Sequence, residues 1–327
     1  MSELYNEALK NRYLNEFENE DSRVVIKYVF VASRNSEENV LERDLYNFNK
    51  EQIGTIIQSM SPKTLNTARS YTAYIRQYIT WAIKNGYREN NLNPLDTANK
   101  EWYSQFIDKT YKIHFSDEEF EDFIESFENA VDQAMFQLFY EGAMGEDFSE
   151  IKNLNYYDID WNKNTIELKD DASEEKRKLK ISDRCVRYLK NAYAQEKYMS
   201  YNVKTKNFNE KELFTGDFIF RNVKHHRTKD IVLSTGVIYT RINAIKEIHG
   251  LDYLTPNGIR QSGMLKEAAE VLQEEGELKY KQFAKLGEKF NVPMFNNNGM
   301  MMYNTTLIKT FITSENLKEL YDIDIDL

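Results

Sequence analysis

Between residues 48 and 92 the hydrophobic and polar positions alternate with the spacing of α-helices. A first helix is predicted to begin around Phe48–Ile53 and to end near Met60. The pair Ser61-Pro62 predicts the N-cap and first position of a second helix, and Asn85-Gly86 predicts its end. Within that second helix the hydrophobic residues recur about every 3.6 positions, at Tyr71, Tyr74, Ile75, Tyr78, Ile79 and Ala82.

The N-terminal 47 residues give weaker signals. Residues 2–18 suit a helix with many charges, so we expect an N-terminal arm or a packed edge and not a core element. The segment 24–31 is β-branched and aromatic, and periodicity does not decide between a strand and a buried helix. The polar residues 33–42 predict a loop or the start of a helix.

The second half of the chain combines helices with a short run of strands. Ser116 and Glu119 form a capping box at the start of a helix, and residues 131–140 predict a helix central to the core. Residues 157–168 alternate on either side of an Asn-rich turn, which predicts a β-hairpin, and residues 178–181 predict a third strand. Ser182-Asp183 then predicts the start of another helix.

These elements define a mostly α protein with a small antiparallel β-sheet, an α+β fold. A length of 327 residues fits about two domains, and Asn93-Pro94 breaks the preceding helix. We therefore expect a helical N-terminal domain at 1–93, a linker at 94–115 and a second domain with a C-terminal tail at 116–327.

Composition narrows the class of protein. Cys185 is the single cysteine, which excludes an intramolecular disulfide and favours a reducing compartment. The four histidines are scattered and have no cysteine partners, so we expect no metal site and no cofactor. No apolar run of about 18 residues and no signal peptide is present, so the sequence predicts a cytoplasmic protein without a membrane partner.

Charge is unevenly distributed along the chain. The net charge is −10, yet three segments are strongly basic. Residues 61–90 contain five basic residues and one acid, residues 176–190 contain seven and one, and Arg221, Lys224, Arg227 and Lys229 surround His225 and His226. Solvated helix faces or hairpins would also produce such runs, but a positively charged groove for double-stranded DNA accounts for all three.

Individual side chains in these segments suit the two kinds of DNA contact. Short hydroxyl and amide side chains beside arginine favour base reading by Asn66, Thr67 and Arg69. Arg260 is predicted one turn into a helix that begins at Pro256, where a helix N-terminus and a guanidinium together favour an anion. The other candidate DNA contacts are Lys63, Thr64, Arg76, Lys176, Arg177, Lys178, Arg184 and Arg227.

Several strings in this order resemble the tyrosine recombinases, or phage integrases. The segment 254–263 resembles the family's T-P-H-x-L-R box, 138–144 resembles L-x-x-x-T-G-x-R, and 149–160 resembles S-E-L-x-x-L-x-x-x-D-I-D. The resemblance covers roughly residues 35–315 and implies a two-domain clamp around DNA. It assigns Arg260 to the family's second arginine, Lys176 or Lys178 to the lysine of the β2–β3 turn, and Tyr303 to the nucleophile.

The family's chemistry also needs residues that this chain lacks at the matching positions. Met144 stands where the first arginine is expected, Asn257 replaces a histidine, and Glu288 stands where a Gly-His pair is expected. Loss of one such donor typically costs a factor of about 10²–10³ in rate. We therefore expect no catalytic residues and no enzyme activity.

The chain as a whole resembles the recombinase-like repressors of SPbeta-type prophages, which implies a DNA-binding transcriptional repressor that occludes phage operator sites and maintains lysogeny. Two alternatives remain open. One is an active site-specific recombinase with Tyr303 as nucleophile, and the other is an adaptor whose basic segments meet an acidic protein. Residues 304–327 are expected to pack on their own domain or, less favoured, on a neighbouring copy, so self-association on DNA is a further expectation.

Overall fold

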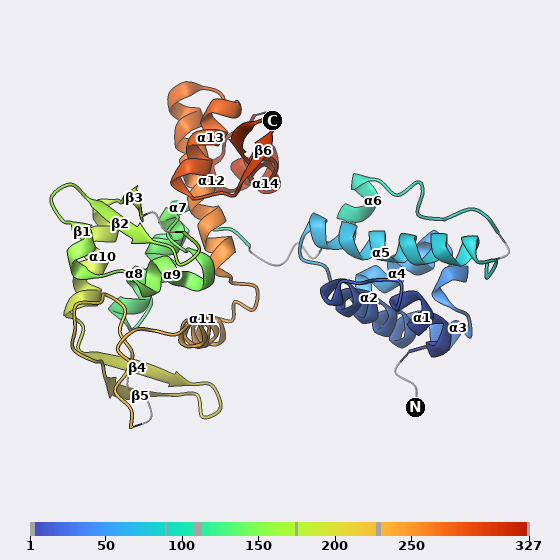
Figure 1. The fold of residues 1–327 in the computed structure, drawn as a ribbon, viewed down its shortest axis with the longest axis horizontal. Helices are drawn as coiled ribbons and strands as arrows, with labels where there is room; N and C mark the ends of the chain where they lie inside the picture. The colour runs from blue at the N-terminus through green and yellow to red at the C-terminus, as the bar shows by residue number, and fades with distance from the viewer. Residues whose placement is uncertain (1–3, 89, 108–112, 174–175, 227–229, 326–327) are drawn as a thin grey trace. The chain divides into compact units, whose positions relative to one another are not determined.

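The computed structural model describes residues 4–88, 90–107, 113–173, 176–226 and 230–325. The chain divides into two compact units, residues 1–111 and residues 112–327, which Figure 1 colours from blue to green and from green to red. Each unit has hydrophobic core residues of its own.

Unit 1 consists of helices joined by turns and loops, with no strand in the part that the structure describes. Asn49 caps α4 and exchanges hydrogen bonds with Gln52, as the predicted helix start requires. The second predicted helix, α5, ends at Lys84, and Gly86 adopts φ 73° directly after it. The helical elements are α1 (Glu7–Leu14), α2 (Glu20–Ser33), a π-helix (Arg34–Glu38), α3 (Asn39–Leu41), a 3₁₀ turn (Leu45–Asn47), α4 (Lys50–Ser59), α5 (Leu65–Lys84) and α6 (Lys100–Ser104).

The start of α5 differs from the sequence prediction. Ser61 has φ 45°, whereas an N-cap residue needs extended backbone, so the predicted Ser61-Pro62 cap is wrong. Thr64 caps the helix instead, because its hydroxyl accepts a hydrogen bond from the Thr67 N–H at 3.1 Å. This contact satisfies one of the four N–H groups that the first turn leaves without a helical partner.

The structure decides both predictions for the N-terminal segments 2–18 and 24–31. The segment 24–31 lies in α2, where Ile26, Val29 and Phe30 form one buried face. The helix α1 contributes Tyr13 and Leu14 to the core, so the expectation that this polar segment stays outside the core is wrong. The charged Lys10 of α1 is fully buried, and so is its partner Glu38. The Nζ of Lys10 lies 2.5 Å from the Glu38 carboxylate, so the two buried charges neutralise each other.

Unit 2 contains the predicted three-stranded antiparallel sheet, with strand order β1-β2-β3, which confirms the α+β class. Ser116 and Ser182 cap α7 and α10 as predicted. Its elements are α7 (Asp117–Glu125), α8 (Ala130–Glu141), a 3₁₀ turn (Glu146–Phe148), α9 (Ser149–Lys152), a 3₁₀ turn (Tyr156–Asp158), β1 (Ile159–Asp160), β2 (Thr165–Lys169), β3 (Lys176–Lys180), α10 (Asp183–Ala194), β4 (Lys197–Asn202), β5 (Asn207–Glu212), α11 (Thr235–His249), α12 (Pro256–Glu275), α13 (Tyr280–Lys289), β6 (Met294–Asn297), β7 (Met300–Tyr303), α14 (Thr305–Lys309) and α15 (Ser314–Tyr321).

The long helix α12 connects two hydrophobic clusters of unit 2. Its N-terminal part contributes Ile259 to the cluster around α8, and its C-terminal part packs with α13, α14 and α15. Where α12 crosses α8, a Cβ on Gly263 would lie 1.7 Å from the Tyr140 carbonyl oxygen, so the two backbones are in direct contact. Figure 1 shows α12 extending from the sheet-containing body toward α13 and α14.

The C-terminal segment packs on its own unit. Ile308, Phe311 and Ile312 are buried against Met264 and Leu265 of α12, which confirms the preferred self-packing. In addition, two hairpins appear that the sequence prediction did not include, β4–β5 and β6–β7. Within the described ranges, no helix is long and apolar enough to cross a membrane.

Candidate nucleic-acid interface and recombinase-like site

The helix α12 begins where the sequence predicts. Thr255 caps it by accepting a hydrogen bond from the Gly258 N–H at 3.0 Å, and Pro256 occupies the first turn. Arg260 follows one turn later and donates to the carbonyl oxygen of Phe290. Burial, and next the charge of Arg177, lower the pKa of Arg260. Its Nε is buried and has no hydrogen-bond partner among the described residues.

A second guanidinium, that of Arg177 in β3, lies near Arg260. Arg177 donates from Nε to Glu150 at 2.5 Å and from Nη2 to the other Glu150 oxygen at 2.8 Å. It also donates to the carbonyl oxygens of Gly142 at 2.8 Å and Lys289 at 3.0 Å. The Glu150 side chain is only 1% exposed. The arrangement is therefore a buried, bidentate ion pair in which the described contacts occupy all three guanidinium nitrogens.

Met144 does not supply a cation beside Arg260. Its side chain packs against the hydrophobic core of unit 2, and its N–H donates to Glu150 at 2.7 Å. The following loop has positive φ angles at Gly145 (70°), Asp147 (49°) and Phe148 (62°). Glu150 thus holds both this loop and Arg177. Sequence reasoning gave Glu150 no role, although it belongs to the Ser-Glu string that resembles the recombinases.

The two lysines proposed for the β2–β3 turn lie on β3 with acidic neighbours. The Nζ of Lys176 is 3.0 Å from Asp158 and 3.8 Å from Glu167, and that of Lys178 is 3.6 Å from Glu167. The hydrogen bond to Asp158 raises the pKa of Lys176. Both residues are exposed, so their ammonium groups remain accessible to a phosphate.

The remaining recombinase-like positions are Asn257, Glu288 and Tyr303. Asn257 and Glu288 are exposed. The ring of Tyr303 is partly buried and packs against Gly287, where an added Cβ would lie 2.8 Å from it. Burial, and then the charge of Glu288, raise the pKa of Tyr303, which disfavours the phenolate. Within the described ranges, no cluster of His, Cys, Asp and Glu could hold a metal ion.

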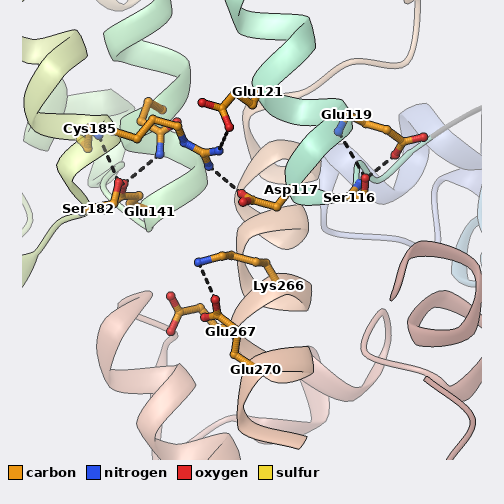
Figure 2. A network of polar contacts seen from close by, with 12 residues as sticks. Ser116, Asp117, Glu119, Glu121, Glu141, Ser182, Cys185, Lys266, Glu267 and Glu270 are labelled. Atoms are coloured by element: carbon orange, nitrogen blue, oxygen red, sulfur yellow. Dashed lines mark hydrogen bonds and ion pairs between the residues drawn. The ribbon is translucent and has the colours of Figure 1, made fainter. Parts of the chain in front are cut away.

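Acidic residues from other parts of the chain pair with most of the 176–190 basic segment. Arg184 contacts Asp117 of α7 at 2.6 Å and Glu121 at 3.1 Å. Arg187 lies 3.4 Å from Glu121 and 3.5 Å from Glu125. Figure 2 shows Asp117 and Glu121 on α7, close to the Ser182–Glu141 contacts at the start of α10. Arg184, which is largely buried, therefore joins α10 to α7.

The third basic segment also has internal partners. Arg221 is buried and donates to the carbonyl oxygens of Ala192, Tyr193 and Gln195. Its guanidinium thereby caps the C-terminal end of α10. Lys224 pairs with Glu212 at 3.0 Å. Arg227 and Lys229 lie outside the described residues.

In unit 1 the predicted DNA contacts fall on α5 and the residues just before it. Asn66 and Arg69 are exposed on one helix face. Thr64 and Thr67 take part in the cap, and Arg76 forms a hydrogen-bonded ion pair with Asp96 at 2.8 Å. The same face continues through Ser70, whose short hydroxyl side chain also suits a DNA contact, and through two exposed residues that the sequence prediction did not include, Ala73 and Gln77.

The helical unit and the unit that contains the antiparallel sheet together have a tyrosine-recombinase-like fold. A solved structure with this fold, the Tn1549 transposon integrase (residues 82–397) in complex with circular intermediate DNA, matches with a TM-score of 0.50 and 10% identity, covering 95% of this chain and 97% of that one. This likeness concerns the fold alone.

The chain belongs to the MrpR family. Residues 114–322 match the MrpR C-terminal catalytic domain, and residues 4–84 match the MrpR N-terminal core-binding domain. A related protein is the SPbeta prophage-derived uncharacterized protein YopR of Bacillus subtilis (strain 168), which is 29% identical over 279 residues, 84% of either chain.

Proposed function

We propose that this protein is a sequence-specific DNA-binding repressor of a prophage that binds operator DNA and does not cut it. The relative from an SPbeta prophage and the integrase solved with DNA support binding to phage DNA. The mechanism is occlusion, in which the protein covers promoter DNA and excludes the transcription machinery.

The internal contacts of Arg177 and Arg260 are the main support for binding without cleavage. The cations nearest the recombinase-like site are held inside the protein, since Arg177 binds Glu150 through two nitrogens and Arg260 donates from Nη2 to the Phe290 carbonyl, while the Nε of Arg260 has no partner among the described residues. A phosphodiester transition state gathers negative charge on oxygens that need free, positioned donors. Here the buried Glu150 carboxylate neutralises the charge of Arg177. Glu288 adds a further negative charge near Tyr303.

The competing function is active site-specific recombination with Tyr303 as nucleophile. Arg177 favours it, because a second arginine lies close enough to Arg260 to lower its pKa. Three features weigh against it: the bidentate Glu150 pair, the exposed Asn257, and the packing of Tyr303 on Gly287. For Arg177 to bind the scissile phosphate, it would first have to leave the nearly fully buried Glu150 carboxylate without its cationic partner.

Within the binding proposal, the exposed face of α5 reads bases through Asn66 and Arg69, and Thr64 and Lys63 lie where they can reach phosphates. Lys176 and Lys178 supply further phosphate contacts. Arg76, Arg177, Arg184 and Arg260 are restrained by their intramolecular contacts and act mainly by holding the surface in place.

Arg69→Ala is expected to weaken operator binding about 5- to 100-fold, because it removes a cation and a base contact worth about 1–3 kcal/mol. The salt dependence of the binding constant should also decrease by about one phosphate contact. Arg43→Ala, which removes the same charge from another exposed position of unit 1, is the control and should change binding far less. Equal losses in both variants would contradict the role of the α5 face.

Tyr303→Phe is expected to leave operator affinity unchanged, because the ring packing on Gly287 is kept and only the hydroxyl is lost. Mobility-shift titrations of genomic fragments from a related prophage, at several salt concentrations, measure this. Retained affinity with a steep salt dependence supports a binding protein. Absence of any salt-sensitive shift in the unchanged protein would favour an adaptor for an acidic protein instead.

A further inference from the structure

The hairpin β6–β7 exposes an unusual amount of apolar surface. Its exposed side chains are Met294 (44%), Phe295 (45%), Met300 (67%) and Met301 (58%). The two strands are joined by Asn298-Gly299, with φ angles of 51° and 90°, as in a tight two-residue turn. Isolated exposed hydrophobic residues are ordinary, but four on one short hairpin, two on each of its faces, indicate an interaction surface.

The strand register separates the two faces of this hairpin. Met294 shares a face with Tyr303, whose ring packs against Gly287 of α13. Phe295 and Met302 share the opposite face, together with Met300. This outer face therefore points away from α13, and its apolar side chains are Phe295, Met300 and Met302, with Asn297 opposite Met300 beside the turn.

The edges of the hairpin lack the usual protection against pairing. Within the described residues, β6 and β7 pair only with each other, so each strand has a further edge. Natural proteins guard such edges with charges, lysine above all. The sequence from 290 to 308 contains no Asp, Glu, Lys or Arg, and it is the longest charge-free stretch of a chain with 29% charged residues.

Charge indicates which partner fits this surface. Two copies of a chain with net charge −10 repel each other at long range, and a surface without charge is where they meet with the least local repulsion. An unlike partner drawn to an acidic protein would instead meet charged side chains. A hairpin is also self-complementary, because two copies related by a two-fold axis present the same strand edge and the same outer face to each other.

We propose that β6–β7 is a self-association surface that joins two copies of this chain, hairpin against hairpin. Flexible methionine side chains adapt to each other across such a contact. The surface is small, so the dimer is weak and forms at micromolar or higher concentrations. This inference goes beyond DNA binding, and its test needs no DNA.

Sedimentation velocity of the full chain from about 1 to 200 µM tests the proposal. The unchanged protein should show a sedimentation coefficient that rises with concentration toward that of a dimer. The double variant Phe295→Lys/Met300→Lys, which changes two side chains of the outer face, should raise the dimer Kd about tenfold or more, and Phe295→Ser/Met300→Ser provides a milder second variant. Circular dichroism checks that each variant is folded.

The matched control is Val24→Lys/Val40→Lys, which places two lysines at exposed hydrophobic positions of unit 1. It should associate as the unchanged protein does. The proposal is overturned if the unchanged protein stays monomeric across the whole range, or if folded hairpin variants associate as strongly as the control. Either result leaves the proposed binding of DNA unaffected.

Discussion

Gly263→Ala is expected to destabilise unit 2 strongly, by about 3 kcal/mol or more, with a fall in melting temperature of roughly 6–12 °C. The added Cβ would lie 1.7 Å from the Tyr140 carbonyl oxygen and 2.7 Å from its carbon. Both atoms belong to the backbone of α8, so no side-chain rotation relieves the overlap. The two helices must separate, and the hydrophobic clusters that α12 connects would lose packing.

Thermal and urea unfolding measure this effect. Gly236→Ala in α11 is the matched control, because a Cβ there meets only the Ser234 hydroxyl, at 3.9 Å. In an open helical position alanine is favoured over glycine by about 0.5–1 kcal/mol, so the control should be neutral or slightly stabilised. A Gly263→Ala protein as stable as the control would show that α8 and α12 do not cross as closely as described.

Arg177→Ala should be the most damaging change at the recombinase-like site, with a loss of about 3–5 kcal/mol in the free energy of unfolding. It leaves the Glu150 carboxylate, 1% exposed, without its bidentate partner. It also removes the donors to the Gly142 and Lys289 carbonyl oxygens, which tie β3 to the ends of α8 and α13. Urea denaturation of the variant and of the unchanged chain gives the difference.

Its neighbour on β3 supplies the control. Lys176 is exposed and bonds to Asp158 at 3.0 Å, so Lys176→Ala should change stability little. If Lys176 contacts phosphate as proposed, the same variant should bind DNA more weakly. If Arg177→Ala were as stable as Lys176→Ala, the ion pair between Arg177 and Glu150 would not stabilise the fold, and the Arg177 side chain could then bind a phosphate instead.

Local sequence signals predicted most of the fold. The start of α4, the caps at Ser116 and Ser182, the period of α5 and the alternation in β1–β3 each depend on residues within a few positions of one another. The cap of α5 was missed because Ser61-Pro62 and Thr64 are both adequate signals, and only the positive φ of Ser61 separates them. The strands of the hairpin at 294–303 were not predicted, and this segment contains no β-branched residue that would signal a strand.

The site could be predicted only in part, because charge counted along the sequence differs from charge in space. Residues 176–190 contain seven basic residues and one acidic residue. Four acidic residues from elsewhere in the fold nevertheless form ion pairs with this segment: Asp117, Glu121, Glu150 and Asp158. The pairing of Arg177 with Glu150 joins residues 27 positions apart, and that of Arg184 with Asp117 joins residues 67 positions apart. No local pattern encodes these contacts.

The most direct test of binding without cleavage is a suicide-substrate assay on DNA fragments that the protein shifts in a gel. A nicked duplex traps any covalent link between Tyr303 and a phosphate, and denaturing electrophoresis separates the adduct. The protein should bind these duplexes with strong salt dependence and give no adduct. A covalent product that forms with the unchanged chain and disappears in Tyr303→Phe would contradict the account and identify an active recombinase.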